Sequence, residues 1–243
     1  MLSPVQTLLL TSMLGTGILV CIFSLNNYVL LYFSRRRKSR KAGRNSVEWP
    51  TVTVQIPTYN EKNVIERTLR SCLDLEYPKE RLEIVVIDDS TDETTDLIKT
   101  YEDRYSPRIK TIHRTTREGY KAGALDVAGK YSQGEYFLIL DADTMPRRDF
   151  LKKTMPLFLE DEKLGFIQGK IEYLNAESSW LTRSLVLAND WYRTFSQSAL
   201  SKGEMFLSFL GHGGIFRRSA IEDAGGWRSD TITEDMDLSY RVR

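Results

Sequence analysis

The stretch Tyr136-Phe137-Leu138-Ile139-Leu140-Asp141-Ala142-Asp143 decides the fold expected of this chain. Its five apolar residues predict a strand buried on both faces, which is typical of a parallel sheet. Ligands of such sheets bind beyond the carboxyl ends of the strands, where the two aspartates stand. Side chains at positions i and i+2 of an extended segment point the same way, so Asp141 and Asp143 can converge on one point.

Two converging carboxylates repel each other unless a cation or a proton lies between them. A divalent cation that prefers oxygen ligands, Mg²⁺ or Mn²⁺, would bind Asp141 and Asp143, and such ions commonly hold substrate phosphates as well. The alternative is an Asp-rich turn that caps a helix, because Asp is common in turns. The remaining sequence decides between the two.

Strand and helix patterns alternate around this stretch. Strand patterns occupy residues 51–56, 82–87 and 109–113, and helical patterns follow at about 64–73, 90–101 and 121–131. Ser90 with Glu93 three residues later is a capping-box signature for the second of these helices. The alternation predicts βαβ units and a mostly parallel, Rossmann-like sheet flanked by helices.

The pattern is less regular from about residue 149 onward. Residues 150–158 look helical, residues 165–173 look extended, and residues 178–202 predict one long helix. An apolar stripe on that helix is interpreted as core packing, and it comprises Leu181, Leu185, Ala188, Tyr192 and Phe195. Packing in the core or at a membrane interface is preferred over sugar stacking for three tryptophans, which are Trp180, Trp191 and Trp227.

The N-terminal segment predicts a membrane anchor. Residues 5–33 carry no charge and are long enough to span a bilayer as a helix, and a basic run follows at 35–41. Because positive residues stay on the cytoplasmic side, we expect the N-terminus outside and the rest of the chain in the cytoplasm. A buried core helix and a cleaved signal peptide are the alternatives, but residues 1–4 lack the basic residues of a signal peptide. The expected organisation is an anchor at 1–33, a basic juxtamembrane linker at 34–50 and an α/β domain at 51–243.

Composition narrows the function classes. The net charge of +1 gives no argument for a nucleic-acid partner. Cys21 and Cys72 have no Cys or His neighbour at metal-ligand spacing, so we interpret both as reduced packing residues. No G-x-x-x-x-G-K phosphate loop occurs, which disfavours another α/β phosphate enzyme, such as a nucleotidyltransferase, built on the same aspartates.

Five motifs stand in an order and spacing that resemble the family 2 glycosyltransferases with the GT-A fold. They are Pro-Thr-Tyr-Asn-Glu at 57–61, Asp-Asp-Ser-Thr-Asp at 88–92, Gly-Tyr-Lys-Ala-Gly-Ala-Leu at 119–125, Asp-Ala-Asp at 141–143 and Thr-Glu-Asp-Met-Asp-Leu at 233–238. The likeness covers about residues 52–243 and is greatest to the processive branch, which includes cellulose synthase and the plant β-mannan and glucan synthases. Each motif alone is weak, but five in register are specific.

The resemblance implies a role for each motif. The residues that would hold the nucleotide sugar are Pro57, Thr58, Tyr59, Glu61, Asp88 or Asp89, Lys121 and Asp141. Arg117 would also face the diphosphate, and Asp141 and Asp143 would bind Mg²⁺ or Mn²⁺, which neutralises the leaving group. Helix capping is the alternative for Asp88 and Asp89.

The resemblance also assigns residues to the acceptor side of the site. Asp235 would be the catalytic base that takes the proton of the acceptor hydroxyl in an inverting displacement, the alternative being an Asp stabilised by a helix dipole. The acceptor would lie against Gly211, His212, Gly213 and Glu234. Leu210 and His212 depart from the residues usual in the family, so the identity of the acceptor stays open.

The implied protein is a membrane-anchored, metal-dependent glycosyltransferase with a cytoplasmic catalytic domain. The expected donor is uridine diphosphate glucose, with guanosine diphosphate mannose as the rival, and the acceptor is a glycan or a lipid-linked hydroxyl. The Gln-x-x-Arg-Trp motif of the processive branch does not occur before Arg243. We therefore expect a C-terminally incomplete GT-A domain, with further membrane subunits as possible partners. A truncated, inactive remnant that binds nucleotide or docks onto a synthase is the alternative.

Overall fold

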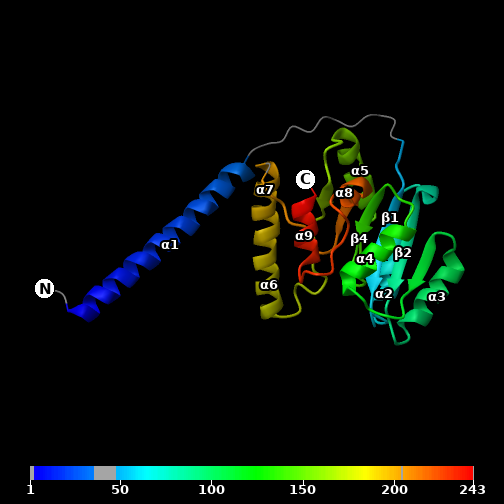
Figure 1. Ribbon diagram of the computed structural model, residues 1–243, viewed down its shortest axis with the longest axis horizontal. Coiled ribbons are helices and arrows are strands. Elements are labelled where there is room, and N and C mark those ends of the chain that lie inside the picture. Colours follow the sequence, from blue (N-terminus) through cyan, green and yellow to red (C-terminus); the bar gives the residue numbers. More distant parts are fainter. Residues whose placement is uncertain (1–2, 36–47, 204, 243) are drawn as a thin grey trace. The chain divides into compact units, whose positions relative to one another are not determined.

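The computed structural model describes residues 3–35, 48–203 and 205–242. The chain divides into two compact units (Figure 1). The helical unit comprises Met1–Arg40 and Glu172–Leu207, and the sheet unit comprises Lys41–Ile171 and Ser208–Arg243. The five motifs of the family resemblance all fall in the sheet unit.

The sheet unit is built around six strands in the order β3-β2-β1-β4-β6-β5. Their bounds are β1 Val52–Thr58, β2 Leu82–Asp88, β3 Ile109–His113, β4 Tyr136–Ile139, β5 Phe166–Gln168 and β6 Gly214–Arg217. Strands β1 to β4 pair in parallel, whereas β6 is antiparallel to both β4 and β5. The mostly parallel sheet expected from the sequence is confirmed.

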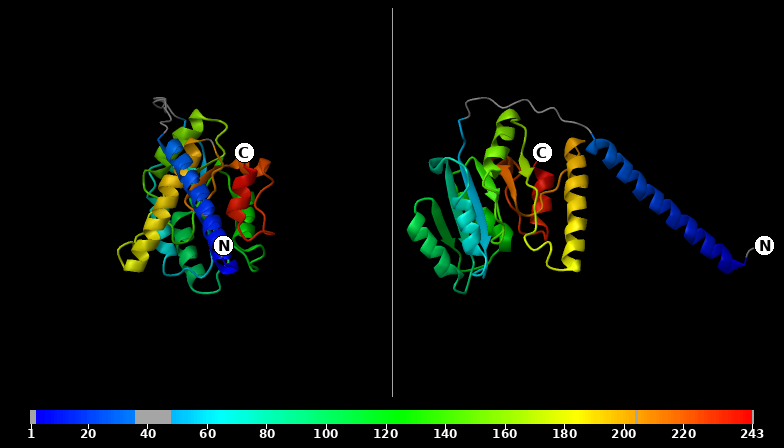
Figure 2. Two further views of the ribbon diagram at one scale, coloured as in Figure 1. Left: turned by 90° about the vertical axis from the view of Figure 1, so that its left-hand side faces the viewer. Right: turned by 180° about the vertical axis from the view of Figure 1, so that it is seen from behind.

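Helices cover both faces of this sheet (Figures 1 and 2). They are α2 Ile65–Leu73, the short 3-10 helix η1 Lys79–Arg81, α3 Thr94–Tyr105, α4 Tyr120–Tyr131, α5 Phe150–Glu160, α8 Arg218–Asp223 and α9 Glu234–Arg241. Alternate strand residues point to opposite faces. Leu138 therefore packs with the side chains of α2, α3 and α5, while Phe137 and Ile139 pack with those of α4, α8 and α9. With both faces apolar, polar ligands are confined to the strand ends.

The helical unit contains α1 Pro4–Ser34, α6 Trp180–Asp190, the π-helical segment η2 Trp191–Gln197 and α7 Ser198–Lys202. The last three follow one another without a break, so the long helix expected at 178–202 is present with a π-helical middle. Ser179 caps its start by accepting a hydrogen bond from the backbone N–H of Thr182 at 3.1 Å. The end of α1 packs against η2 and α7.

Two expectations about these helices are wrong. The stripe on the 178–202 helix is not core, because Leu181 and Leu185 are 55 and 57% exposed and no residue of α6 is buried. Periodicity reveals that a helix has an apolar face but not what covers that face. The capping box is also absent, since Ser90 Oγ accepts a hydrogen bond from the N–H of Asn60 and the N-cap residue, Glu93, makes no side-chain cap.

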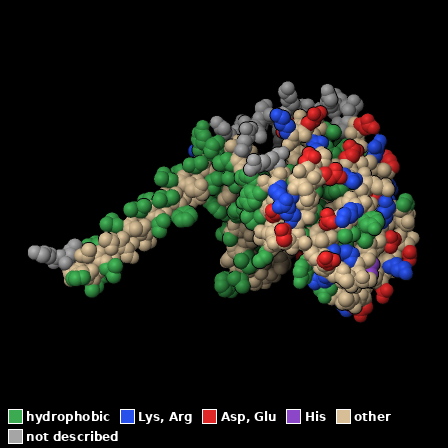
Figure 3. Space-filling view, in the orientation of Figure 1, with side chains coloured by type: hydrophobic (Ala, Val, Ile, Leu, Met, Phe, Trp, Pro, Cys, Tyr) green, Lys and Arg blue, Asp and Glu red, His purple; other side chains and the backbone are tan. Residues whose placement is uncertain are grey.

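Among the described residues, one helix is long and apolar enough to cross a membrane. It is α1, which has 31 residues and whose most apolar stretch of 18 residues has a mean hydropathy of 2.2 and no buried residue. Figure 3 shows hydrophobic side chains along its length. Most of the expected linker at 34–50 lies outside the described residues, which omit 36–47.

Candidate active site

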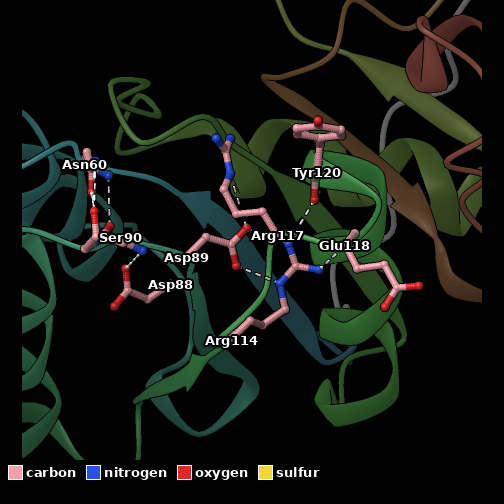
Figure 4. Close-up of polar contacts among 9 residues, drawn as sticks. Asn60, Asp88, Asp89, Ser90, Arg114, Arg117, Glu118 and Tyr120 are labelled. Atoms are coloured by element: carbon pink, nitrogen blue, oxygen red, sulfur yellow. Dashed lines mark hydrogen bonds and ion pairs between the residues drawn. The ribbon is translucent and has the colours of Figure 1, made fainter.

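The turns that follow β1 and β2 are bonded into one rim at the carboxyl ends of these strands. The N–H of Asp89 donates to the carbonyl of Thr58 at 2.9 Å. Asn60 adopts a φ of +56°, a left-handed conformation that Asn tolerates better than most residues. This conformation lets its N–H donate to Ser90 Oγ and its Oδ1 accept from the N–H of Thr91, both at 2.9 Å (Figure 4).

The buried side chain of Asp88 stabilises this rim through hydrogen bonds. Its side chain is fully buried and accepts hydrogen bonds from the N–H of Ser90 at 3.0 Å and from Thr95 Oγ1 at 2.6 Å, with His113 Nδ1 at 3.0 Å. Burial alone would raise the pKa of Asp88, but these hydrogen bonds outweigh it and lower the pKa. Both oxygens of Asp88 are therefore bonded within the fold.

Asp89 forms a two-pronged ion pair with Arg114 that sequence reasoning missed. Nε and Nη2 of Arg114 lie 2.6 and 2.5 Å from the two carboxylate oxygens of Asp89. The same guanidinium donates to the carbonyls of Glu118 and Tyr120 at 3.0 Å each, which ties the end of β2 to the turn that opens α4 (Figure 4). The available signal was an arginine placed directly after the 109–113 strand pattern.

Arg117 covers Tyr59 instead of standing free. Its guanidinium carbon lies 3.5 Å from the ring centre of Tyr59, and its Nε lies 3.9 Å from Asp89 Oδ2. Tyr59 is 39% exposed, so it stays partly accessible at the rim although Arg117 lies over its ring.

Lys121 joins the aspartate motif to the loop before β6. Its ammonium group pairs with the carboxylate of Asp141 and donates to the carbonyl of Gly211 at 3.0 Å. The loop is also bonded directly to the end of β4, because the N–H of Gly213 donates to the carbonyl of Ile139 at 2.8 Å. His212 Nδ1 lies 2.8 Å from the hydroxyl of Thr144, next to the motif.

Gln168 on β5 fixes the same loop, and sequence reasoning missed it. Its Oε1 accepts a hydrogen bond from the N–H of Leu210 at 2.9 Å, and its Nε2 donates to the carbonyl of His212 at 3.0 Å. No motif signals this role, because it depends on β5 pairing with β6.

Asp235 reaches this loop from the first turn of α9. Gly211 has a φ of +84°, and a Cβ added there would lie 3.2 Å from Asp235 Oδ2 and 3.8 Å from Lys121 Nζ. Asp235 and Lys121, whose ammonium group pairs with Asp141, therefore both lie next to Gly211. Glu234 begins α9 and is half-buried.

The aspartate motif fits a divalent cation. The pKa of Glu61 is raised, first by burial and then by the negative charges of Asp143, Asp141 and Asp92, so negative charge gathers at this strand end. Within the described ranges no three His, Cys, Asp or Glu side chains form a ready metal cage. Asp141 and Asp143 would thus supply protein oxygens while substrate phosphate and water complete the shell, which is how Mg²⁺ and Mn²⁺ are usually held beside phosphates.

The match to known proteins agrees with this geometry. The family model described as Glycosyl transferase family 2 matches residues 53–225. The chain belongs to glycosyltransferase family 2. The GT-A fold and the family expected from the motifs are thereby confirmed.

Plant enzymes are among the most similar relatives of this family member. Glucomannan 4-beta-mannosyltransferase 7 of Arabidopsis thaliana is 39% identical over 204 residues, which cover 81% of this chain and 37% of the relative. Glucomannan 4-beta-mannosyltransferase 1 of Cyamopsis tetragonoloba is 36% identical over 204 residues, covering 81% of this chain and 39% of the relative. The chain thus spans less than half the length of the curated relatives it matches.

Solved structures show the same fold. The mannosyltransferase PcManGT from Pyrobaculum calidifontis, in complex with GDP-Man and Mn²⁺, has a TM-score of 0.72 and 27% identity, covering 88% of this chain and 57% of that protein. TarS of S. aureus, residues 1–349 in complex with UDP, has a TM-score of 0.58 and 21% identity over 78% of this chain and 54% of that one, and this likeness concerns the fold alone. The expected preference for uridine diphosphate glucose finds no support in these relatives.

Proposed function

We propose that this family 2 glycosyltransferase is a membrane-anchored, metal-dependent inverting enzyme that transfers mannose from guanosine diphosphate mannose to a hydroxyl of a glycan. The observation that carries the proposal is the meeting of Asp141, Lys121 and Asp235 around Gly211. The choice of sugar is supported by relatives named as mannosyltransferases and by the neighbour solved with GDP-Man and Mn²⁺.

The donor would lie across the rim formed by the two strand-end turns. Tyr59 offers a ring for the base, and Asp89 offers a carboxylate whose position Arg114 holds. The remaining residues assigned to the nucleotide sugar are Pro57, Thr58, Glu61 and, through its contacts, Asp88. Lys121 and Arg117 would bring positive charge to the diphosphate.

A cation held by Asp141 and Asp143 would neutralise the charge that develops on the departing diphosphate. Lys121 is poised to share that task, because its ammonium group already contacts Asp141. The protein residues would otherwise bind and orient the donor so that its anomeric carbon faces the loop at 211–213.

Asp235 would act from the opposite side of the anomeric carbon. Its carboxylate takes the proton of the acceptor hydroxyl, the acceptor oxygen forms the new bond to the carbon, and the bond to the diphosphate breaks to release guanosine diphosphate. Acceptor contacts are assigned to Gly211, His212, Gly213 and Glu234. The positive φ of Gly211 and Gly213 lets the backbone approach a sugar closely.

The membrane part of the proposal rests on α1. A helix of 31 residues, uncharged and exposed over most of its length, followed by the basic run at 35–41, supports an anchor whose N-terminus faces outward and whose sheet unit is cytoplasmic.

The deciding experiment titrates the purified chain with guanosine diphosphate mannose and uridine diphosphate glucose in the presence of Mn²⁺, and follows guanosine diphosphate release with a mannan oligosaccharide. We expect the mannose donor to bind more tightly. Asp235→Asn should bind the donor as the wild type does while transfer falls about a thousandfold, since a general base contributes about 10²–10⁴. Asp223→Asn, an exposed site with the same charge change, should transfer normally.

Three outcomes would count against the proposal. Tighter binding of uridine diphosphate glucose would reverse the donor assignment. Donor binding by the wild type without any transfer would favour the nucleotide-binding alternative. Absence of binding to either donor would overturn the proposed function as a whole.

A further inference from the structure

The loop at 209–213, which leads into β6, has neither helical nor strand structure. Its backbone N–H and carbonyl groups therefore need partners from other parts of the fold. The loop begins at Phe209, whose fully buried ring packs edge-on against Phe216 with 4.9 Å between the ring centres. The start of the loop is thus fixed in the apolar core, and the polar contacts decide how the rest of it lies.

Gln168, the last residue of β5, binds the loop on both sides of Gly211. Its Oε1 accepts a hydrogen bond from the N–H of Leu210 at 2.9 Å, and its Nε2 donates to the carbonyl of His212 at 3.0 Å. The reverse orientation of the amide would set an N–H against an N–H and an oxygen against a carbonyl, so only this orientation satisfies both groups. One side chain therefore fixes the span of the loop around Gly211.

Ser239 joins the start of the same loop to the helix that carries Asp235. The residue is 1% exposed, and its hydroxyl accepts a hydrogen bond from the N–H of Phe209 at 2.7 Å and donates to the carbonyl of Asp235 at 2.5 Å. A hydroxyl can make both bonds at once, because it has one donor and two acceptor positions. A single buried oxygen thus links the loop to the residue assigned as the catalytic base.

These contacts set the spacing between the loop and the carboxylate of Asp235. A Cβ added to Gly211 would lie 3.2 Å from Asp235 Oδ2, so the two are close neighbours. Gln168 holds the loop from β5 and Ser239 holds it from α9, on opposite sides of the sequence. Such precision matters for a transfer reaction, since a displacement of about 1 Å can lower a rate about a hundredfold.

We propose that Gln168 and Ser239 are positioning residues of the transfer reaction, which together hold the loop at 209–213 at the distance from Asp235 that an acceptor sugar requires. The inference rests on the proposed function, in which this loop binds the acceptor and Asp235 takes its proton. Both residues act through the loop and not on the nucleotide. Removing either should therefore weaken the use of the acceptor and leave donor binding intact.

The test compares the variants Gln168→Met and Ser239→Ala, made in the full chain, which remove these hydrogen bonds with little change of shape. Titration calorimetry with guanosine diphosphate mannose and Mn²⁺ gives the donor affinity, which should stay at the wild-type value. Transfer is then measured at saturating donor over a range of mannan oligosaccharide concentrations. In each variant the KM for the oligosaccharide should rise, and kcat/KM should fall about tenfold or more.

Ser132 is a matched control for Ser239. It is 4% exposed, and its hydroxyl accepts from Gln55 Nε2 at 2.9 Å and donates to the carbonyl four residues before it at 2.7 Å, as Ser239 does. It lies before the amino end of β4, whereas the loop meets the other end of that strand. Ser132→Ala and Gln55→Met should lower the free energy of unfolding in urea as the loop variants do, and should keep the wild-type KM for the oligosaccharide.

A double variant shows whether the two residues act on one loop. Because the first substitution already displaces the loop, kcat/KM in Gln168→Met/Ser239→Ala should fall by less than the product of the two single losses. Losses that multiply would refute the shared role, because the residues would then act independently.

The remaining outcomes separate this inference from the function on which it rests. A wild type that transfers, with an unchanged KM in both single variants, refutes the inference alone. An equal rise of KM in Ser132→Ala refutes it too, because lost stability would then explain the effect. A wild type that transfers nothing refutes the proposed function, and the inference with it.

Discussion

At the residue scale, the donor rim depends on Arg114. Its guanidinium binds both oxygens of Asp89 and two backbone carbonyls at the start of α4, and the Arg114 side chain is only 10% exposed. Arg114→Lys keeps the charge but loses the planar fork, so Asp89 and the turn before Lys121 lose their common support. We expect the affinity for guanosine diphosphate mannose with Mn²⁺ to fall about tenfold, or about 1.4 kcal/mol, by titration calorimetry.

Arg67→Lys, on the exposed side of α2, is the matched control for this change and should bind the donor normally. An equal loss of affinity in both variants would show that the bidentate pair with Asp89 has no part in donor binding.

The buried carboxylate of Asp88 should make the stability of the fold depend on pH in the acidic range. Although burial works against its ionisation, hydrogen bonds from Thr95 and Ser90, with His113 beside them, lower its pKa in the folded protein. A folded-state pKa below the unfolded value, about 3.9, means that this stabilisation is fully present above that pH and is lost as the pH falls through the folded pKa. Urea unfolding at several pH values between neutral and strongly acidic gives the free energy of unfolding. We expect this free energy to be lower in Asp88→Asn than in the wild type at neutral pH, and to fall less in the variant as the pH is lowered.

The control for this prediction is Asp96→Asn on α3, whose side chain is exposed. It should follow the wild-type pH profile. An unchanged acid profile in Asp88→Asn would show that another carboxylate sets the acid sensitivity.

At the scale of elements, the loop at 211–213 can be tested with two matched glycines. Gly211 and Gly225 have φ angles of +84° and +80°, so Ala costs about 1–2 kcal/mol of backbone strain at either position. An added Cβ at Gly211 would lie 3.2 Å from Asp235 Oδ2, whereas nothing lies within 4 Å of one at Gly225. We expect similar losses of stability by urea unfolding, but a loss of transfer of about tenfold or more only in Gly211→Ala. Equal transfer rates in the two variants would show that the loop at 211–213 takes no part in the reaction.

Elements were the part of the structure that local sequence signals predicted best. Apolar runs and turn residues located β1 to β4 and the helices between them, because these signals act over a few neighbouring residues. Ser90 was assigned wrongly to a helix cap for the same reason, since the bond it makes is to Asn60, 30 residues away.

At the scale of the whole molecule, α1 should keep the chain in the membrane. Its Pro4–Ser34 helix carries no charged residue and is mostly apolar. We expect the chain to stay in the membrane fraction after alkaline carbonate extraction and to keep its N-terminal residues, as read by mass spectrometry of the purified protein. A co-expressed soluble protein should be released by the same treatment. Loss of the first 30 or so residues would identify a cleaved signal peptide instead, since such signals span about 15–30 residues.

The family, the alternation of strands and helices in a mostly parallel sheet, and the strand ends at which acidic residues gather could all be predicted from the sequence. These properties follow from periodicity and from motifs whose members stand close together in the chain. The sequence also placed Asp141 and Asp143 just after the strand at 136–140, but the pleated alignment expected of them is wrong, because β4 ends at Ile139 and Asp143 lies in a turn.

Which of these residues touch depends on how the elements pack in three dimensions. Lys121 reaches the carbonyl of Gly211 across 90 positions of sequence, and Asp88 turns inward while Asp89 takes Arg114 as its partner. Likewise, the stripe on α6 is exposed although its pattern equals that of a core helix. Such contacts depend on how separate elements pack, and a local pattern carries no information about the partner that packing brings to it.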